Sequence, residues 1–390
     1  MIELKEGYKK SEIGIIPEEW EVVKLGDILE YEQPTKYLVE TTNYSNNYLT
    51  PVLTAGKSFI LGYTKEINGI YQNLPAIIFD DFTTASKYVD FPFKAKSSAM
   101  KILKVKNKKY PTRLFYEYLN NVEFFASTHK RYWISEYQYL KIPLPPLKEQ
   151  KKIADILSST DEKIDSITSQ IEKTERLKKG LLQKLLSKGI GHNRFKDSEL
   201  GKIPESWKVV QQKKVATFYN GRAYKLSEWE EEGTPVIRLQ NLTGSGKNYY
   251  YSKMELPKHQ YCSFGDLLYM WSATFGPVWW YGEKAIYHYH IWKISTDEKK
   301  LNKNFLYYLL YGITIRMKNE AHGSTMIHLT KRDMEKLKIP LPPLQEQKEI
   351  ADILSTADEK IEILKAKKQK YEIVKKGLLQ KLLSGEIRTL

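Results

Sequence analysis

The chain carries one segment twice, as LKIPLPPLKEQKKIADILSSTDEKI at residues 140–164 and as LKIPLPPLQEQKEIADILSTADEKI at residues 337–361. When the comparison is extended to residues 140–187 and 337–384, the two copies are identical at 33 of 48 positions. Chance similarity does not reach that level, so the segment is an internal duplication. A repeat of this kind predicts one structural unit written twice along the chain.

A weaker repeat upstream gives the order of the parts. SEIGIIPEEWEVV from Ser11 matches SELGKIPESWKVV from Ser198, 187 residues later, whereas the strong repeat is spaced by 197 residues. The second variable domain is therefore 10 residues longer than the first. The two variable domains are also faintly similar, as in AIIFDDFTTAS beside DLLYMWSATFG. We expect two variable domains, each followed by a conserved helical spacer, over residues 1–141, 142–189, 190–338 and 339–390.

The conserved segment has the features of a helix with a defined start. Pro145 and Pro146 stand where proline is tolerated, at the first turn, and Glu149 and Gln150 follow in that turn. Further along, the sequence STDE from Ser159 to Glu162 matches a capping box. The pattern therefore predicts that a second helix begins there, and likewise in the second copy.

The predicted helices carry an apolar stripe. We considered ten positions in each copy, spaced alternately by four and three residues. Seven are apolar in the first copy, which starts at Ile153, and eight in the second, which starts at Ile350. One such stripe is typical of ordinary helix packing, but two nearly identical copies favour a coiled coil between them. The predicted seam includes Ile164, Ile167, Ile171, Leu181, Leu185, Ile361, Leu364, Leu378 and Leu382.

The variable domains have mixed secondary-structure signals. Short apolar runs at 75–79, 99–105, 234–239 and 290–294 are typical of strands, and 113–128 and 303–317 of helices. The predicted fold class is therefore α+β, with mixed α/β domains and a helical coiled-coil spacer.

Composition indicates a folded protein with a polyanionic partner. The chain is 41% hydrophobic, which excludes a disordered polyelectrolyte, and its formal charge of +15 favours nucleic acid. Cys262 is the single cysteine, so an internal disulfide is excluded. The charged N-terminal stretch does not resemble a secretory signal, and no apolar run of about 18 residues occurs. We expect a soluble, cytoplasmic protein without a membrane partner.

The motifs of several enzymes are missing. No NPPY-type methyltransferase motif occurs, and GSGKN from Gly244 lacks the rest of a P-loop, so it is predicted to be a hairpin tip. The pair His288 and His290 alternates as strand residues do and lacks zinc spacing. The Asp-Glu-Lys runs at 161–163 and 358–360 are typical of a solvated helical turn and not of a nuclease. The sequence predicts no catalytic site, metal or cofactor in this chain.

Basic and hydroxyl residues in predicted loops are the candidates for DNA contact. Arginine and lysine neutralise phosphates or bind guanine, asparagine pairs with adenine, and hydroxyls bind the backbone. Any one of them is also an ordinary surface residue, and Trp271, Trp279 and Trp280 favour a core. The candidates are Lys36, Tyr37, Thr83, Thr84, Lys87, Lys130, Arg131, Tyr132, Arg222, Tyr224, Lys225, Arg238, Asn241, Thr274, Ser324, Thr325 and His328.

The order of variable and conserved parts, with IPLPPLKEQKKIADIL and IPLPPLQEQKEIADIL, resembles the specificity subunit of type I restriction-modification systems. GSTMIHLT from Gly323 also resembles the end of a target-recognition domain of that family, whereas the first domain ends without Gly-Ser-Thr. The resemblance covers the whole chain. It implies two target-recognition domains that each read half of a split double-stranded DNA site, and conserved helices that pair antiparallel as a spacer.

The resemblance also implies partners that carry the chemistry. Two modification subunits would dock on the conserved helices, bind S-adenosylmethionine and methylate adenine N6, and restriction subunits would use ATP and Mg. The chain itself would be a non-catalytic specificity subunit. Two other classes remain open, a coiled-coil adaptor between proteins and a tandem nucleic-acid-binding protein of another kind. The charge disfavours the adaptor, and the missing RNP-type and GXXG motifs disfavour an RNA-binding protein.

Overall fold

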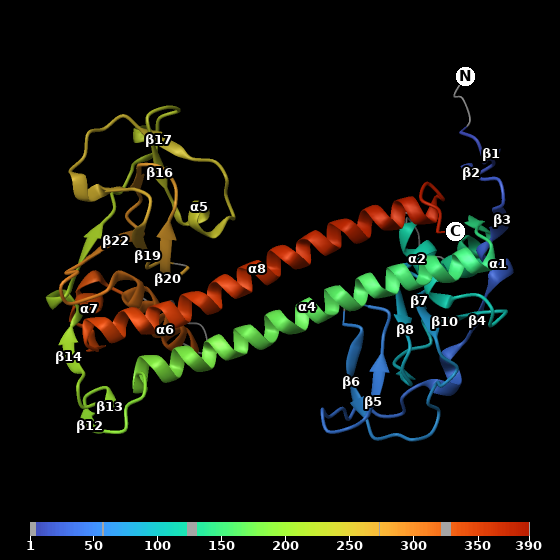
Figure 1. The fold of residues 1–390 in the computed structure, drawn as a ribbon, viewed down its shortest axis with the longest axis horizontal. Coiled ribbons are helices and arrows are strands. Elements are labelled where there is room, and N and C mark those ends of the chain that lie inside the picture. Colours follow the sequence, from blue (N-terminus) through green and yellow to red (C-terminus); the bar gives the residue numbers. More distant parts are fainter. Residues whose placement is uncertain (1–4, 57, 123–130, 273, 321–328, 390) are drawn as a thin grey trace. The chain divides into compact units, whose positions relative to one another are not determined.

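The computed structural model describes residues 5–56, 58–122, 131–272, 274–320 and 329–389 (Figure 1). The chain divides into two compact units, one of residues 1–168 and 366–390 and the other of residues 169–365. Both divisions fall inside long helices, α4 (Leu147–Lys188) and α8 (Leu344–Leu383). Each unit therefore consists of one variable domain with part of each long helix.

The first unit is built on an antiparallel sheet of four strands in the order β4-β10-β7-β8. Its strands are β4 (Leu29–Glu32), β7 (Ala76–Asp80), β8 (Ser86–Val89) and β10 (Met100–Val105). A smaller sheet has the order β6-β5-β9, from β5 (Thr50–Leu53), β6 (Ile60–Thr64) and β9 (Lys94–Ala95). The paired strands β1 (Tyr8–Ser11), β2 (Gly14–Pro17), β3 (Glu21–Lys24) and β11 (Lys141–Leu144), and the helices α1 (Leu25–Ile28), α2 (Thr112–Asn121) and α3 (Tyr132–Ser135), complete this domain.

The second unit repeats this plan. Its four-stranded sheet has the order β15-β22-β19-β20, from β15 (Ala216–Asn220), β19 (Asp266–Met270), β20 (Gly276–Trp280) and β22 (Ile291–Thr296). Its smaller sheet has the order β17-β16-β21-β18, from β16 (Thr234–Ile237), β17 (Tyr250–Ser252), β18 (Tyr261–Cys262) and β21 (Ala285–Tyr287). The remaining elements are β12 (Phe195–Ser198), β13 (Gly201–Pro204), β14 (Lys208–Gln211), β23 (Lys338–Leu341), α5 (Leu239–Thr243), α6 (Lys303–Glu320) and α7 (Lys331–Lys336).

The four-stranded sheets of the two units have equivalent strand orders, whereas the smaller sheet has three strands in the first unit and four in the second. In each smaller sheet, one pair is antiparallel and the next is parallel, β5 with β9 in the first unit and β16 with β21 in the second. The predicted α+β class, the duplication and the predicted strands are confirmed. GSGKN lies in the connection between the antiparallel strands β16 and β17, in agreement with the predicted hairpin tip, and Gly244, with a left-handed φ of 74°, ends α5 there.

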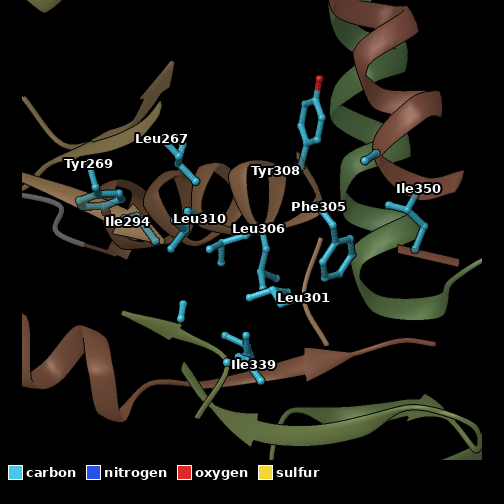
Figure 2. Packing of buried hydrophobic residues seen from close by; sticks show 14 of the residues in the cluster. Leu267, Tyr269, Ile294, Leu301, Phe305, Leu306, Tyr308, Leu310, Ile339 and Ile350 are labelled. Atoms are coloured by element: carbon cyan, nitrogen blue, oxygen red, sulfur yellow. The ribbon is translucent and has the colours of Figure 1, made fainter. Parts of the chain in front are cut away.

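The core of each unit joins the domain to the long helices. In the second unit, Phe305 and Leu306 of α6 pack with strand residues and with Ile350 of α8 (Figure 2). The same cluster includes Leu182 and Leu185 near the end of α4. In the first unit, the start of α4 and the end of α8 share a core in the same way. The start of one helix therefore packs with the end of the other in each unit, which is the antiparallel pairing.

The apolar seam has the predicted burial. Every position of the four-three stripe is buried or half-buried, whereas most positions between them are exposed. Ile167, Ile361 and Leu364 are at most 5% exposed. The predicted second helix start is wrong, because α4 and α8 each run without a break through the capping-box residues. Helical neighbours on both sides of Ser159 supply its backbone hydrogen bonds, so a local start signal has no effect there.

Two equivalent ion pairs also join the helices. Asp161 of α4 lies 2.7 Å from the amine of Lys375 in α8, and Lys178 of α4 pairs with Asp358 of α8. Asp161 and Asp358 occupy matching positions of the repeat, as do the two lysines. The predicted solvated turn at 161–163 is therefore wrong for Asp161, which is half-buried and also binds Arg113 of α2.

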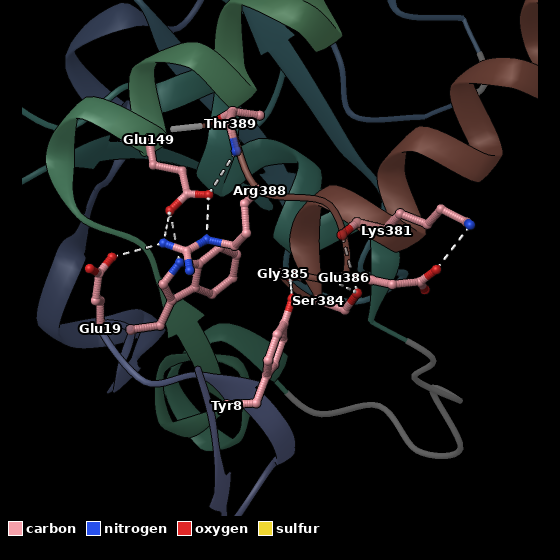
Figure 3. A network of polar contacts seen from close by, with 10 residues as sticks. Tyr8, Glu19, Glu149, Lys381, Ser384, Gly385, Glu386, Arg388 and Thr389 are labelled. Carbon is pink, nitrogen blue, oxygen red and sulfur yellow. Dashed lines mark hydrogen bonds and ion pairs between the residues drawn. The ribbon is translucent and has the colours of Figure 1, made fainter. Parts of the chain in front are cut away.

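In each unit, a carboxylate in the first turn of one long helix joins that helix to the domain and to the segment after the other long helix. Glu149, in the first turn of α4, accepts the indole N–H of Trp20 at 2.9 Å (Figure 3). Arg388, in the segment after α8, donates to the same carboxylate at 2.9 and 3.1 Å, and the Thr389 N–H at 3.0 Å. Burial raises the pKa of Glu149, but these hydrogen bonds outweigh it and hold the pKa below its ordinary value.

The second unit repeats this arrangement at Glu346. Its carboxylate accepts the indole N–H of Trp207 at 2.9 Å and the Ile190 N–H at 3.1 Å, and lies 2.7 Å from the ring of His192. The next residue in each copy is a glutamine: Gln150 donates to the Pro145 carbonyl and Gln347 to the Pro342 carbonyl, each at 2.8 Å. The repeated PLPPL-x-EQ sequence therefore ties a domain, a helix start and the end of the opposite helix together.

The lowered pKa of Glu149 makes the stability of the first unit depend on pH. When folding lowers the pKa of a carboxylate, the carboxylate stabilises the fold fully at pH values above its ordinary pKa of 4.5. This stabilisation is lost as the pH falls through the pKa of the folded state. We expect Glu149→Gln to be less stable than the natural chain by about 1.5–3 kcal/mol at pH 7, and by much less at pH 3. Unfolding in urea at both pH values measures the difference. Glu175→Gln, at an exposed position of α4, is the control. A deficit equal at both pH values would contradict this role.

Candidate nucleic-acid interface

Three of the predicted DNA-contact residues come together in the second unit. Arg222 follows β15, Tyr224 lies in the next loop, and Arg238 follows β16. Five side chains there form one continuous series of contacts, in the order Arg222, Tyr224, Trp229, Tyr250 and Arg238, which we call the aromatic stack. Strand pairing creates it, because β17 brings Tyr250 beside β16.

The aromatic stack has close ring spacing. Tyr224 and Trp229 are stacked with centroids 4.7 Å apart, and the centroids of Trp229 and Tyr250 are 4.6 Å apart. The guanidinium of Arg222 lies 5.1 Å from the Tyr224 ring, and that of Arg238 lies 4.2 Å from the Tyr250 ring. Cations over ring faces are attracted by the ring quadrupole, so the rings hold both guanidinium groups in place.

The neighbouring histidines contribute no charge near neutral pH. Burial lowers the pKa of His288 to about 4, with further contributions from the charges of His290 and Arg238. Burial also lowers the pKa of His290. His288 directly follows β21 and forms an isolated β-bridge with Arg222, whereas His290 lies in the turn before β22 and not in a strand. No group of three His, Cys, Asp or Glu side chains that could hold a metal occurs within the described part of the chain.

The other candidates of the second domain differ in what their side chains contact. Asn241 uses both amide atoms within its own loop, where it accepts the Arg238 N–H at 2.9 Å and donates to the Asn248 carbonyl at 3.0 Å. It therefore positions Arg238 and has little capacity left for a base. Lys225 is exposed, and Thr274 is exposed at the tip between β19 and β20. Ser324, Thr325 and His328 lie outside the described residues.

In the first domain, the candidates Thr83 and Thr84 form the tip between β7 and β8, which is equivalent to the tip that carries Thr274. Thr84 has a φ of 60°, the one positive value among the described residues other than glycine. Such strain persists where the surroundings hold it, and it is common at binding sites. Asp80 accepts the N–H groups of Phe82 and Thr83 at 2.9 Å and so holds the turn.

The remaining candidates of the first domain are separated. Lys36 is exposed and Lys87 is half-exposed, whereas the Tyr37 hydroxyl donates to Glu32 at 2.8 Å. Arg131 is exposed next to Tyr132, which is 1% exposed and belongs to the core. The predicted DNA contact is therefore wrong for Tyr132, whose ring fills the interior. Lys130 lies outside the described residues.

The sequence analysis missed Trp229 and Tyr250. Trp229 stands in a polar loop segment five residues after Tyr224, and Tyr250 begins the short strand β17, whose pairing with β16 brings its ring to Trp229. Trp271, Trp279 and Trp280 are half-buried against the two cores of the second unit, in agreement with the predicted core role. The useful signal for the missed residues was the composition of the loop, in which arginine, tyrosine and tryptophan are interleaved.

The comparisons with known proteins agree with this plan. The family described as "Type I restriction modification DNA specificity domain" matches the chain twice, over residues 17–176 and 204–372. The specificity subunit of the type I restriction enzyme MjaVIII of Methanocaldococcus jannaschii is 32% identical over 413 residues, which cover 98% of this chain and 96% of the relative. The specificity subunit of EcoR124I/EcoR124II of Escherichia coli is 40% identical over 239 residues, or 57% of this chain and 55% of that one.

Solved structures share the fold at low identity. The S subunit of a type I restriction-modification system from M. genitalium has a TM-score of 0.62 at 17% identity, with 98% of both chains covered. A chain from a structure on complex assembly of the type I R-M system has a TM-score of 0.55 at 18% identity, with 95% of this chain and 99% of that chain covered.

The chain belongs to the type I restriction-modification specificity family. It is a specificity subunit with two target-recognition domains, the non-catalytic component of a type I restriction-modification complex. None of the helices in the described ranges is long and apolar enough to cross a membrane.

The first tip depends on a buried ion pair. Asp81 lies 3.3 Å from the amine of Lys101, with side-chain exposures of 3% and 2%, and it also accepts the Trp133 N–H at 2.9 Å. We expect Asp81→Ala to destabilise the first unit by about 3–5 kcal/mol, because Lys101 remains buried without its partner. The double variant Asp81→Ala with Lys101→Met should recover much of that loss. Urea unfolding of the three chains tests this, and a cost below about 1 kcal/mol for the single variant would refute it.

Proposed function

We propose that the chain reads a bipartite double-stranded DNA site, one half with each target-recognition domain, with an unread spacer of fixed length between the halves. The observation that supports this most directly is the repeated topology on one continuous antiparallel helix pair. Two readers of equivalent fold with different loops suit two half-sites of different sequence. The excess of positive charge supplies affinity through phosphate contacts.

We propose that the tips and loops carry the readout and the helices carry the spacing. Thr84 and Thr274 stand at equivalent tips, and the aromatic stack lies in loops of the second domain. In each unit, carboxylate contacts hold the helix ends to the domain, which suits a connection of defined length. Changes in the loops can then alter the bases read without altering the spacer.

The chemistry is proposed to come from partners. Two modification subunits would dock on the conserved helices and supply S-adenosylmethionine for methylation of adenine N6, and restriction subunits would supply ATP and Mg²⁺ chemistry. Two copies of one partner fit the repeat, since the conserved segments are identical at 33 of 48 positions. Because the substrate is DNA, the complex is proposed to act in the cytoplasm.

This division of labour predicts where activity appears. The purified chain alone should transfer no methyl group to DNA, and addition of its modification subunit should produce adenine methylation at one bipartite motif. Transfer of a labelled methyl group from S-adenosylmethionine to DNA measures both. Methyl transfer by the isolated chain, free of contaminants, would overturn the proposed function.

The spacing role predicts the effect of lengthening both helices. Four residues inserted after Thr168 and four after Lys365 should separate the domains by a further 6 Å or so. At about 34 Å for each ten base pairs, the unread spacer should grow by one or two base pairs. The bases read on either side should stay the same. Methylation-site maps of the natural and lengthened complexes measure the spacer directly.

The matched control exchanges one reader. When residues 208–338 are replaced by the corresponding domain of a relative, one half-site should change and the spacer should not. A changed half-site after the insertion, or a changed spacer after the exchange, would contradict the proposed separation of reading and spacing.

A further inference from the structure

The two arginines of the aromatic stack differ in their polar contacts. Arg222 forms an ion pair with Glu228, so its charge is balanced within the domain. Arg238 has no carboxylate within ion-pair distance among the described residues. The Nε atoms of both arginines are buried without a hydrogen-bond partner there, so the missing carboxylate is what distinguishes Arg238. A buried donor without an acceptor costs free energy. The guanidinium of Arg238 is therefore held in place and unsatisfied, as a group awaiting an acceptor would be.

Arg238 lines an open pocket of about 800 Å³, formed by the segments before and after β16 and by the start of β17. The polar residues that line this pocket are Glu230, Glu231, Arg238, Gln240, Lys247 and Asn248. Two carboxylates balance the two cations, so the pocket has no excess positive charge with which to hold a phosphate. Its mixture of donors and acceptors suits the edge of a base pair instead.

The chemistry favours one base pair. In the major groove, guanine presents two acceptors, O6 and N7, which arginine binds with two parallel hydrogen bonds, and the paired cytosine presents an amino donor. Carboxylates accept hydrogen bonds from that amino group. A pocket with one unsatisfied arginine beside Glu230 and Glu231 has both complements.

We propose that Arg238 is the residue with which the second target-recognition domain reads guanine in a G·C pair of its half-site. Tyr250 is a positioning residue, because its ring lies 4.2 Å from the Arg238 guanidinium and in turn contacts the Trp229 ring at a centroid distance of 4.6 Å. Asn241 positions the backbone of Arg238. The inference rests on the proposed function and adds to it a base and the residue that selects the base.

The test uses the full chain assembled with its modification subunit and a library of randomised double-stranded DNA. Bound molecules are sequenced, and affinities for the selected site and its single-base variants are measured at several salt concentrations. The key variant is Arg238→Lys, which keeps the charge and loses the two parallel hydrogen bonds. Arg238→Ala is the second variant. Arg316→Ala, on an exposed face of α6 with no ion pair among the described residues, is the matched control.

We expect both Arg238 variants to lose discrimination at one G·C pair of the second half-site by about 10- to 100-fold. The first half-site, the spacer and the other positions should be unchanged, and Arg316→Ala should match the natural chain. Tyr250→Ala should relax the same base pair, and Tyr250→Phe, which keeps the ring, should restore its recognition. A merely structural defect would weaken all positions alike.

Three results would overturn the assignment. The first is a selected second half-site without a G·C pair, and the second is unchanged discrimination in both variants. The third is a uniform loss of affinity in Arg238→Ala, with a salt dependence lower by about one phosphate contact, and with normal affinity in Arg238→Lys. The last result would make Arg238 a phosphate contact. If the natural complex selected no sequence at all, the proposed function itself would fail, which is a distinct outcome.

Discussion

The arrangement of each unit depends on one carboxylate in the first turn of a long helix, Glu149, which is buried, or Glu346, which is half-buried. Glu149 and Glu346 each accept a hydrogen bond from an indole N–H of the preceding domain. Each also accepts hydrogen bonds from the segment that follows the opposite helix. Carboxylates buried in this way are stable because several donors replace water. One side chain thus determines how a domain, a helix start and a helix end meet. Removal of any donor leaves a charge that is poorly solvated.

The same constraint explains which parts of the repeat have stayed alike. Residues 140–164 and 178–187 are identical to their counterparts at 31 of 35 positions, whereas residues 165–177 are identical at 2 of 13. The similar parts contain Glu149 and Glu346 and the ion-paired Asp161 and Lys178. The divergent middle needs only a buried stripe, which many apolar residues satisfy. The two copies are therefore most alike where each side chain must make several specific contacts at the same time.

This difference also explains what could be predicted from the sequence. Periodicity is a local property, so the seam, the strands and the duplication were predictable. The indole–carboxylate contact was not, because Trp20 and Glu149 are 129 residues apart and each has an ordinary local role. The capping box at Ser159 was misleading, since a continuing helix overrides a local start signal. Tyr132 was misassigned because polar neighbours concealed a core position.

The candidate interface was harder to predict because it is assembled from three separate segments. Arg222 to Trp229, Arg238 and Tyr250 meet only when β16 pairs with β17, and nothing in the loop sequences announces that pairing. The smaller sheet is also where the two domains differ, with three strands in the first and four in the second. The four-stranded sheets, in contrast, have the same order in both. A domain of this design can change what it reads by altering the smaller sheet and its loops, because the contacts that hold it to the helices lie in other elements.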